Sequence, residues 1–567
     1  MDFTRKRMRL GDILLEQEVI DQEALNAALK QSKEEGQRLG EYLVDKGIVT
    51  EIKLAKALQY QLGYRFIDLG TVEIPDDITG LVRGDVLRKY KMMPYERDAK
   101  NPNVLRVAMV DPMDIMAIDD VEIITNLQVE PVVATQSAVA AALDKYYGNE
   151  EANAMAEAYR AERGFDSDEE VEEEDAKDDN SPIVVIVRSM IEQAARQGTS
   201  DIHIEALETE VRVRYRIDGA LYNRLRYDIK MLPAIIARIK IIGGMDISEK
   251  RKPQDGRITA VVDRNEYDIR VNILPTVYGE KCVMRLASKK ALKRDKQLLG
   301  FEDSEMAKFD RILQHPHGIM LVTGPTGSGK STTLYTALSE LNKEDVNIVT
   351  VEDPVEANVD GVNQVHVNPK VDLTFASALR AILRQDPDII MIGEIRDNET
   401  ADIAVKAAIT GHLVVSTLHT NSAASTITRL EDMGIESYLI ADSVVGIIAQ
   451  RLVRRLCTEC RRKVSMDELD DEDLKLLDIK EGEKIEIYDK VGCPTCNNTG
   501  YKGRIGIYEI MEVTKGLAHI IAKNGNAEEI SNFALSEGMN TLAMACRIKV
   551  KKGITTMSEM RRIVYEA

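Results

Sequence analysis

A glycine-rich turn that follows an apolar segment constrains the fold of this chain more than any other feature. Residues 318–323 read GIMLVT and predict a buried strand, and the turn GPTGSGKS follows directly at residues 324–331. Glycines in the spacing G-x-x-x-x-G-K-S allow backbone N–H groups to surround phosphate oxygens, while the lysine reaches the terminal phosphates and the serine ligates Mg²⁺. The pattern predicts an ATP and Mg²⁺ site formed by Gly324, Pro325, Thr326, Gly327, Ser328, Gly329, Lys330, Ser331 and Thr332.

Strands and helices alternate along the C-terminal part of the chain. After the turn and the helix that should follow it, apolar segments occur at residues 347–353, 389–394 and 413–419. Such alternation indicates a parallel sheet with helices on both faces. We therefore expect an α/β domain over residues 298–567.

Two further segments place carboxylates where such a sheet binds its ligands. Residues 386–394, DPDIIMIGE, form an apolar strand that ends in Glu394, and we expect this strand to lie beside the strand of the glycine-rich turn. Residues 352–356, EDPVE, directly follow another apolar strand. Open α/β sheets bind ligands outside the carboxyl ends of their strands, where a carboxylate can hold Mg²⁺ or its waters. Either segment alone could be a solvated turn, but together with the phosphate-binding turn they favour a functional site.

The rest of the chain divides by composition. Residues 181–290 alternate in polarity and are rich in β-branched residues, which predicts an α+β domain. Residues 149–180 include the acidic run GFDSDEEVEEEDAKDDN, which predicts a self-repelling, flexible linker. Residues 1–148 form an N-terminal domain, in which helices are expected over positions 1–65 and a small α/β unit after them.

Composition also limits the class of protein. The net charge is −20, aromatic residues make up 5% of the chain, and no basic stripe with interleaved aromatic residues occurs. Direct nucleic-acid binding is therefore not expected. Because the sequence has no apolar run long enough to span a membrane and no secretory leader, we expect a cytoplasmic protein that reaches the cell membrane through partners.

Four of the six cysteines form two C-x-x-C pairs, at positions 457–460 and 493–496. Two such pairs supply the four thiolates of a tetrahedral Zn²⁺ site, although their separation exceeds that of a common zinc ribbon. A redox function needs one accessible pair of low pKa, so the second pair favours a structural zinc module, which we expect over residues 452–505. The predicted ligands are Cys457, Cys460, Cys493 and Cys496.

A near-repeat occupies positions 1–65, and each copy predicts a short helix, a turn and a second helix. The offset between matching positions is constant. Arg9, Leu10 and Gly11 of the first copy correspond to Arg38, Leu39 and Gly40 of the second. The second copy also has Gly47 and Gln61, where the first copy has Glu18 and Ser32.

Four segments of the chain carry a family resemblance. They read GPTGSGKST, TVEDPVE, LRQDPDIIMIGEIRD and TGHLVVSTLHTNSA. Together they strongly resemble the secretion ATPases of type II secretion and type IV pilus assembly, and the resemblance covers essentially the whole chain. It implies a RecA-like domain that hydrolyses ATP and works as a homohexamer.

The resemblance also implies roles for individual residues. Glu356 and Glu394 would be the water-activating and Mg²⁺-organising carboxylates; we favour Glu356 as the general base, although the residues alone do not apportion the two roles. His412 and His419 would sense the state of the nucleotide.

The same resemblance implies roles for four arginines. Arg270 and Arg285, in the 181–290 domain, would swing onto the phosphates as arginine fingers and offset the charge of the γ-phosphoryl group. The alternative is that they form ion pairs at a strand edge. Arg380 and Arg384 also match arginines of the family's nucleotide site, and we expect them on one face of a helix.

The N-terminal repeat and the cysteine module each resemble a known module. The R-L-G repeat resembles N-terminal domains of the MshEN type, which bind cyclic di-GMP, so Arg9, Leu10, Gly11, Arg38, Leu39, Gly40 and Gln61 become candidate ligands. Glu18 and Ser32 depart from that pattern and weaken the expectation; the alternative is a helical adaptor that docks a membrane-bound partner. The cysteines resemble the tetracysteine loop of assembly ATPases.

These resemblances predict a motor that powers type IV pilus extension and acts on an inner-membrane platform protein and an adaptor. Retraction ATPases of the same superfamily typically lack both the tetracysteine loop and the long N-terminal region. The alternatives are a type II secretion ATPase, an adaptor that cyclic di-GMP regulates and whose ATPase activity is secondary, and a DNA-uptake motor.

Overall fold

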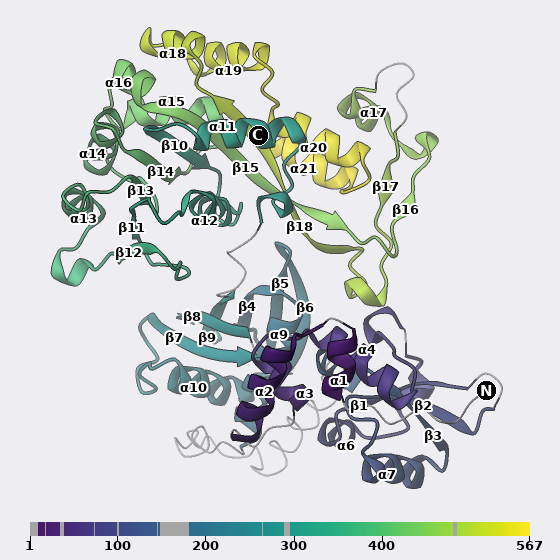
Figure 1. The fold of residues 1–567 in the computed structure, drawn as a ribbon. Coiled ribbons are helices and arrows are strands. Elements are labelled where there is room, and N and C mark those ends of the chain that lie inside the picture. The colour runs from purple at the N-terminus through teal and green to yellow at the C-terminus, as the bar shows by residue number, and fades with distance from the viewer. Residues whose placement is uncertain are drawn as a thin grey trace. The chain divides into compact units, whose positions relative to one another are not determined.

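The computed structural model describes residues 10–17, 19–34, 39–72, 74–98, 101–143, 146–147, 181–263, 265–288, 295–479 and 485–566. The chain splits into two compact units, residues 1–286 and 287–567, and we describe each by itself (Figure 1). Among the described residues, no helix has the length and apolar character needed to cross a membrane.

Four helices at the start of the chain form two similar hairpins. They are α1 (Leu10–Glu16), α2 (Gln22–Glu34), α3 (Leu39–Asp45) and α4 (Glu51–Leu62), as the repeat predicts. A Cβ atom on Gly11 would lie 3.1 Å from Leu25 Cδ1, and one on Gly40 would lie 3.3 Å from Leu54 Cδ1. The same close glycine–leucine contact thus recurs in both copies of the repeat, and a side chain at either glycine would require the facing leucine to shift.

The segment after the hairpins forms a three-stranded sheet with short helices. Antiparallel strands β1 (Met92–Arg97) and β2 (Val104–Met109) are followed by β3 (Gln128–Val133), which pairs with β2 in parallel. The helices are α5 (Asp76–Thr79), α6 (Gly84–Lys89) and α7 (Ile115–Thr125).

A six-stranded sheet and two helices make up the rest of the first unit. The sheet has the order β6-β5-β4-β9-β8-β7, and α9 (Pro182–Arg196) and α10 (Leu232–Ile242) pack their apolar residues against it. This is the α+β arrangement predicted from the alternating pattern. The strands are β4 (Thr199–Ala206), β5 (Glu210–Ile217), β6 (Ala220–Asp228), β7 (Gln254–Val262), β8 (Asn265–Thr276) and β9 (Gly279–Ser288).

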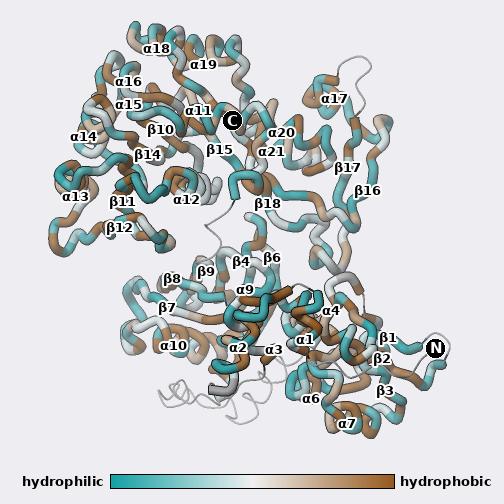
Figure 2. Tube along the Cα trace, in the orientation of Figure 1, coloured by the Kyte–Doolittle hydropathy of each residue, from teal (hydrophilic) through white to brown (hydrophobic). Residues whose placement is uncertain are grey.

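A seven-stranded sheet is the centre of the second unit. Its order is β12-β11-β13-β14-β10-β15-β18, and Figure 2 colours its central strands largely brown, in keeping with their complete burial. Two apolar clusters on its opposite faces agree with the predicted helical layers. The strands are β10 (Gly318–Thr323), β11 (Ile348–Glu352), β12 (Val362–His366), β13 (Ile389–Ile392), β14 (Leu413–Leu418), β15 (Val444–Leu456) and β18 (Tyr501–Glu512).

Two details of this sheet differ from the prediction. The last strand, β18, pairs with β15 in antiparallel orientation, so the sheet is mixed at one edge. Strand β14 lies between β10 and β13, so the strand that leads to Glu394 is not the direct neighbour of the strand that leads to the glycine-rich turn. Strand order depends on how the crossover helices pack, which local polarity patterns do not encode.

Helices surround this sheet in Figure 1, and a small two-stranded ribbon extends from it. The ribbon pairs β16 (Arg462–Lys463) with β17 (Tyr488–Asp489). The helices are α11 (Asp303–Leu313), α12 (Lys330–Leu341), α13 (Phe375–Ile382), α14 (Asn398–Ile409), α15 (Ala423–Asp432), α16 (Ser437–Ser443), α17 (Asp471–Leu477), α18 (Lys515–Ala522), α19 (Ala527–Ser536), α20 (Leu542–Lys551) and α21 (Met557–Glu566).

Candidate nucleotide site and tetracysteine cluster

The glycine-rich turn joins β10 to α12, as predicted. Gly324, Gly327 and Gly329 have φ values of 148°, 80° and 92°, a region that residues other than glycine rarely adopt. Helix α12 begins at Lys330, so its free N–H groups open onto the turn. The Lys330 Nζ donates hydrogen bonds to the carbonyl oxygens of Gly324 at 2.7 Å and Pro325 at 3.0 Å. The turn therefore encloses its own lysine at the end of a helix.

The chemistry of this turn fits a phosphate. The pKa of Lys330 is lowered to about 8, mainly by burial, with Glu394 opposing the shift and the positive charge of Arg451 adding to it. An anion in the turn would stabilise the charged amine. The buried Ser328 hydroxyl has no hydrogen-bond partner among the described residues, while Ser331 is exposed beside it.

A carboxylate and an imidazole follow β13 and β14, two strands that pair with each other. Glu394 lies just beyond β13, and its carboxylate forms an ion pair with Arg396. His419, directly after β14, places its Nε2 3.5 Å from the second carboxylate oxygen of Glu394. Burial, followed by the charge of Lys330, lowers the pKa of His419. Glu394, His419 and Lys330 thus influence one another at the carboxyl ends of three strands.

A tyrosine outside the sequence motifs links the helix after the turn to the EDPVE segment. Tyr335, on α12, donates a hydrogen bond to the buried carboxylate of Glu352 at 2.5 Å. Its oxygen accepts from the backbone N–H groups of Glu356 at 3.2 Å and Ala357 at 3.3 Å. Glu352 also accepts from Thr350, at 2.7 Å. Glu352 is therefore a structural anchor that fixes the loop of Glu356, and a large tyrosine in the helix KSTTLYTAL was the available signal.

Two other candidate residues, His412 and Arg384, lie toward the amino ends of the strands and away from the turn. His412 precedes β14, at the opposite end from His419, and its Nδ1 is 2.9 Å from the carbonyl oxygen of Ala407. Helix α13 ends at Ile382, so Arg384 follows the helix, and the prediction that Arg380 and Arg384 share one helical face is wrong. Arg380 pairs with Glu399, and Arg384 donates to the carbonyl oxygen of Arg380 at 2.7 Å.

The two arginines that are candidate arginine fingers lie on neighbouring strands of the six-stranded sheet, Arg270 on β8 and Arg285 on β9. Arg285 donates from its Nε to Asp201 at 3.0 Å and keeps 61% of its side chain exposed. Arg270 stands opposite Arg257 in the β7–β8 register. The ion pair of Arg285 joins two neighbouring interior strands, β4 and β9, and is a structural interaction of the kind that the sequence leaves open as an alternative to an arginine finger, although not at an edge of the sheet.

The four cysteines of the two pairs converge, and their geometry fits zinc. The four Sγ atoms all lie within 4.8 Å of one another, and the Cys457–Cys493, Cys460–Cys496 and Cys493–Cys496 separations are each 3.8 Å. A tetrahedron with Zn–S bonds of about 2.3 Å has sulfur–sulfur edges of about 3.8 Å, whereas a disulfide needs about 2.05 Å.

Backbone groups complete this cluster. The N–H groups of Cys493 and Gly500 donate to Cys496 Sγ, each at 3.2 Å, and the N–H of Gly492 donates to Cys460 Sγ at 3.3 Å. These donors stabilise thiolates, which are the form that binds a metal.

The N-terminal candidates are described only in part. Leu10 and Leu39 begin α1 and α3, while Gly11 and Gly40 pack against leucine side chains. Gln61 lies in the last turn of α4. Arg9 and Arg38, the residues with most of the expected ligand chemistry, lie outside the described residues.

Comparison with known proteins identifies two sequence families. The family "Type II/IV secretion system protein" matches residues 176–562, and the MshEN domain matches residues 62–153. The chain is 43% identical to the type IV pilus assembly ATPase PilB of Myxococcus xanthus over 560 residues, which cover 97% of this chain and 98% of that protein. It is 40% identical to the type II secretion system protein E of Xanthomonas campestris over 574 residues, which cover both chains completely.

A solved structure supports the fold. The ATPase DotB of Legionella pneumophila aligns with a TM-score of 0.51 at 22% identity and covers 68% of this chain and 96% of its own. With the phosphate-binding turn, the carboxylates beyond the parallel strands and the match over residues 176–562 in agreement, the chain belongs to the family of type II/IV secretion system proteins.

Proposed function

We propose that this protein is an ATPase motor that powers the assembly of type IV pili. The observation that carries the proposal is the partly buried Lys330 amine, held inside a glycine turn of positive φ, where Glu394 favours its charge and where that charge in turn lowers the pKa of His419. Similarity to a pilus assembly ATPase over 97% of the chain supports the pilus as its output.

The described contacts suggest how the residues divide the work. Lys330 would exchange its two carbonyl partners for oxygens of the terminal phosphates, and Ser331 and Glu394 would hold Mg²⁺ or its waters. Mg²⁺ supplies positive charge that offsets the charge developing on the phosphoryl group. His419 orients the Glu394 carboxylate. Glu356 accepts a proton from the attacking water, and Tyr335 fixes its loop.

The remaining proposed roles depend on the domains of the chain and on its assembly with other chains. The chain consists of domains at residues 1–148, 181–290 and 298–567, with a linker at 149–180 and a zinc module at 452–505. In a homohexamer at the cytoplasmic face of the membrane, the arginines at 270, 285, 380 and 384, together with His412, serve nucleotide sites. Hydrolysis moves an inner-membrane platform protein. Cyclic di-GMP is a regulatory ligand of the N-terminal repeat.

The test replaces Lys330 by alanine in cells whose only copy carries the change. We expect purified Lys330→Ala protein to lose ATP turnover by on the order of 10²-fold or more, because a charge that stabilises the transition state is removed, and the cells to lose their surface filaments. The exposed Lys343, just after α12, provides a matched control: Lys343→Ala should keep both turnover and filaments. Parental turnover in Lys330→Ala protein would refute the assignment of the site.

A type II secretion ATPase is the second candidate, because a type II secretion protein E is similar over the complete chain. The same cells distinguish the two. Intact filaments together with an exported protein trapped inside the cell would assign the motor to secretion, whereas loss of filaments with normal export assigns it to the pilus.

A further inference from the structure

Strand β15 runs alongside the phosphate-binding turn. It pairs with β10 in parallel up to Thr323 and Ala449, and β10 then ends where the turn begins. Strand β15 continues with Gln450 and Arg451. These two side chains therefore lie next to the turn, although they come much later in the chain.

The carboxamide of Gln450 joins two parts of the turn. Its Nε2 donates to the carbonyl oxygen of Ser328 at 2.9 Å, and its Oε1 accepts from the Thr333 hydroxyl at 2.7 Å. Because a carbonyl oxygen can only accept, the nitrogen must face Ser328. Gln450 is 2% exposed and Thr333 is fully buried, so water cannot replace either bond.

The glycines at the two ends of the turn pack on the same residue. A Cβ atom on Gly324 would lie 2.5 Å from the Gln450 carbonyl oxygen, and one on Gly329 would lie 2.7 Å from Gln450 Nε2. Both glycines are thus needed for contact with Gln450 as well as for their backbone angles. The turn lies on a surface that β15 provides.

The neighbouring Arg451 connects this surface to the loop after β14. Its Nη1 donates to the Gln450 carbonyl oxygen at 3.1 Å, and its Nη2 donates to Asn421 Oδ1 at 3.1 Å. Asn421 follows His419 closely in the same loop. A buried guanidinium therefore links the strand to the loop of His419.

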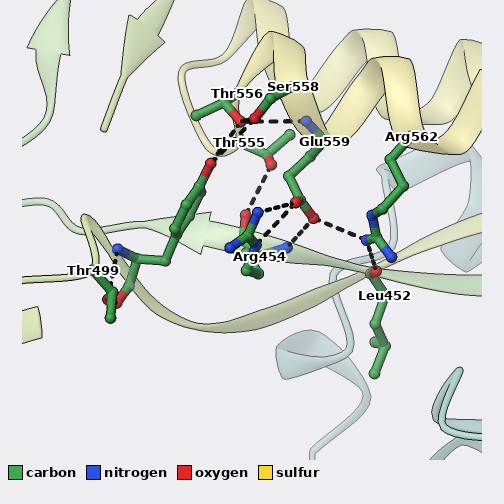
Figure 3. A network of polar contacts seen from close by, with 9 residues as sticks. Leu452, Arg454, Thr499, Thr555, Thr556, Ser558, Glu559 and Arg562 are labelled. Carbon is green, nitrogen blue, oxygen red and sulfur yellow. Dashed lines mark hydrogen bonds and ion pairs between the residues drawn. The ribbon is translucent and has the colours of Figure 1, made fainter. Parts of the chain in front are cut away.

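Strand β15 is itself held firmly. Figure 3 shows Arg454 facing Glu559 of α21, with contacts at 2.9 Å from Nε and 2.7 Å from Nη2. Arg562 donates to the Leu452 carbonyl oxygen and to Glu559, each at 2.9 Å, and the Arg454 guanidinium lies 4.1 Å from the centre of the Tyr501 ring. The strand therefore gives Gln450 a rigid base.

We propose that Gln450 is a positioning residue that holds the phosphate-binding turn in its ligand-ready shape, through the Ser328 carbonyl group on one side and the Thr333 hydroxyl on the other. The inference rests on the proposed nucleotide site and adds to it a residue outside the G-x-x-x-x-G-K-S pattern. Glutamine is required because glutamate has no donor for the Ser328 carbonyl oxygen and would place a negative charge beside the phosphates.

Binding of MgADP to the full-length protein tests the proposal, measured by calorimetry well below the melting temperature. We expect Gln450→Met to raise the Kd about tenfold and Gln450→Glu to raise it more. Thr333→Val should also weaken binding, whereas Thr333→Ser, which keeps the hydroxyl, should bind like the parent. The double variant Gln450→Met/Thr333→Val should lose less than the product of the two single losses, because both remove one shared interaction.

A matched control separates positioning from stability. The Ser443 hydroxyl is buried and bonds the Leu439 carbonyl oxygen at 2.7 Å, so Ser443→Ala removes a comparable bond away from the turn and should keep the parental Kd. Lower melting temperatures with an unchanged Kd in Gln450→Met and Thr333→Val would overturn the proposal. If Gln450→Glu does not fold, the near-isosteric Thr333→Val decides. A parent protein that does not bind MgADP would instead refute the nucleotide site itself.

Discussion

Lys330 gives the site a measurable dependence on pH. Its pKa of about 8, lowered mainly by burial, means that about half of the amines are neutral at pH 8, whereas phosphate oxygens favour the charged form. Nucleotide binding should therefore take up protons near pH 8, and affinity should fall as pH rises above 8. In the free protein the charged amine is disfavoured by folding, so this group's penalty on stability is full below pH 8 and disappears as pH rises toward 10.5.

Calorimetry of nucleotide binding in two buffers of different ionisation enthalpy, at pH 7 and pH 8.5, measures this uptake. We expect fewer protons taken up at pH 7, where the amine is already charged. Equal uptake at both values would contradict the lowered pKa.

Tyr335 should matter for turnover because it holds both Glu352 and the loop of Glu356. Tyr335→Phe leaves the buried Glu352 carboxylate short of a donor, at a cost of about 1–3 kcal/mol, and frees the loop that carries the proposed base. We expect turnover to fall about tenfold, equivalent to about 1.4 kcal/mol in the barrier. Tyr215→Phe is the matched control, since the buried Tyr215 hydroxyl donates to the Met190 carbonyl oxygen at 2.9 Å, on β5 of the six-stranded sheet. Equal losses in both variants would contradict the role of Tyr335.

Among the elements, the segment between β15 and β18 carries a prediction about metal. Four sulfur atoms at the corners of a zinc-sized tetrahedron should hold one Zn²⁺ per chain. Removing the metal should lower the melting temperature, because four buried or half-buried thiols would then lack their common partner. Elemental analysis and thermal unfolding measure both effects. Cys460→Ser should lose the metal, whereas Cys546→Ala, at a buried cysteine outside the cluster, should keep it; less than half an equivalent in fresh parental protein would contradict the prediction.

The elements also show what the sequence could predict. The turn at 324–331, the strands at 318–323 and 413–418 and the convergence of the cysteines were predictable, because each depends on local periodicity or on spacing. The position of β14 between β10 and β13, the antiparallel β18 and the contact of Gln450 with the turn were not. These depend on which strands become neighbours, and that follows from packing across the whole sheet.

In the whole molecule, separate cores correspond to the composition shifts along the chain. The six-stranded sheet, the three-stranded sheet and the first hairpins each bury their own apolar cluster, and the seven-stranded sheet has one on each face. Such independent cores are why domain-sized segments could be recognised from sequence. How a hexamer would combine the arginines of one part with the phosphate-binding turn of another is a property of the assembly, which the sequence of one chain does not express.

The recurring contact in the two N-terminal hairpins indicates that they share a common origin. The glycine–leucine contact that recurs at Gly11 and Gly40 is what a tandem duplication of one ancestral hairpin would leave behind. Away from this contact the two copies differ, for example at Ser32, which stands where the second copy has Gln61. Two copies of one hairpin can therefore diverge in sequence and still keep the same packing between their helices.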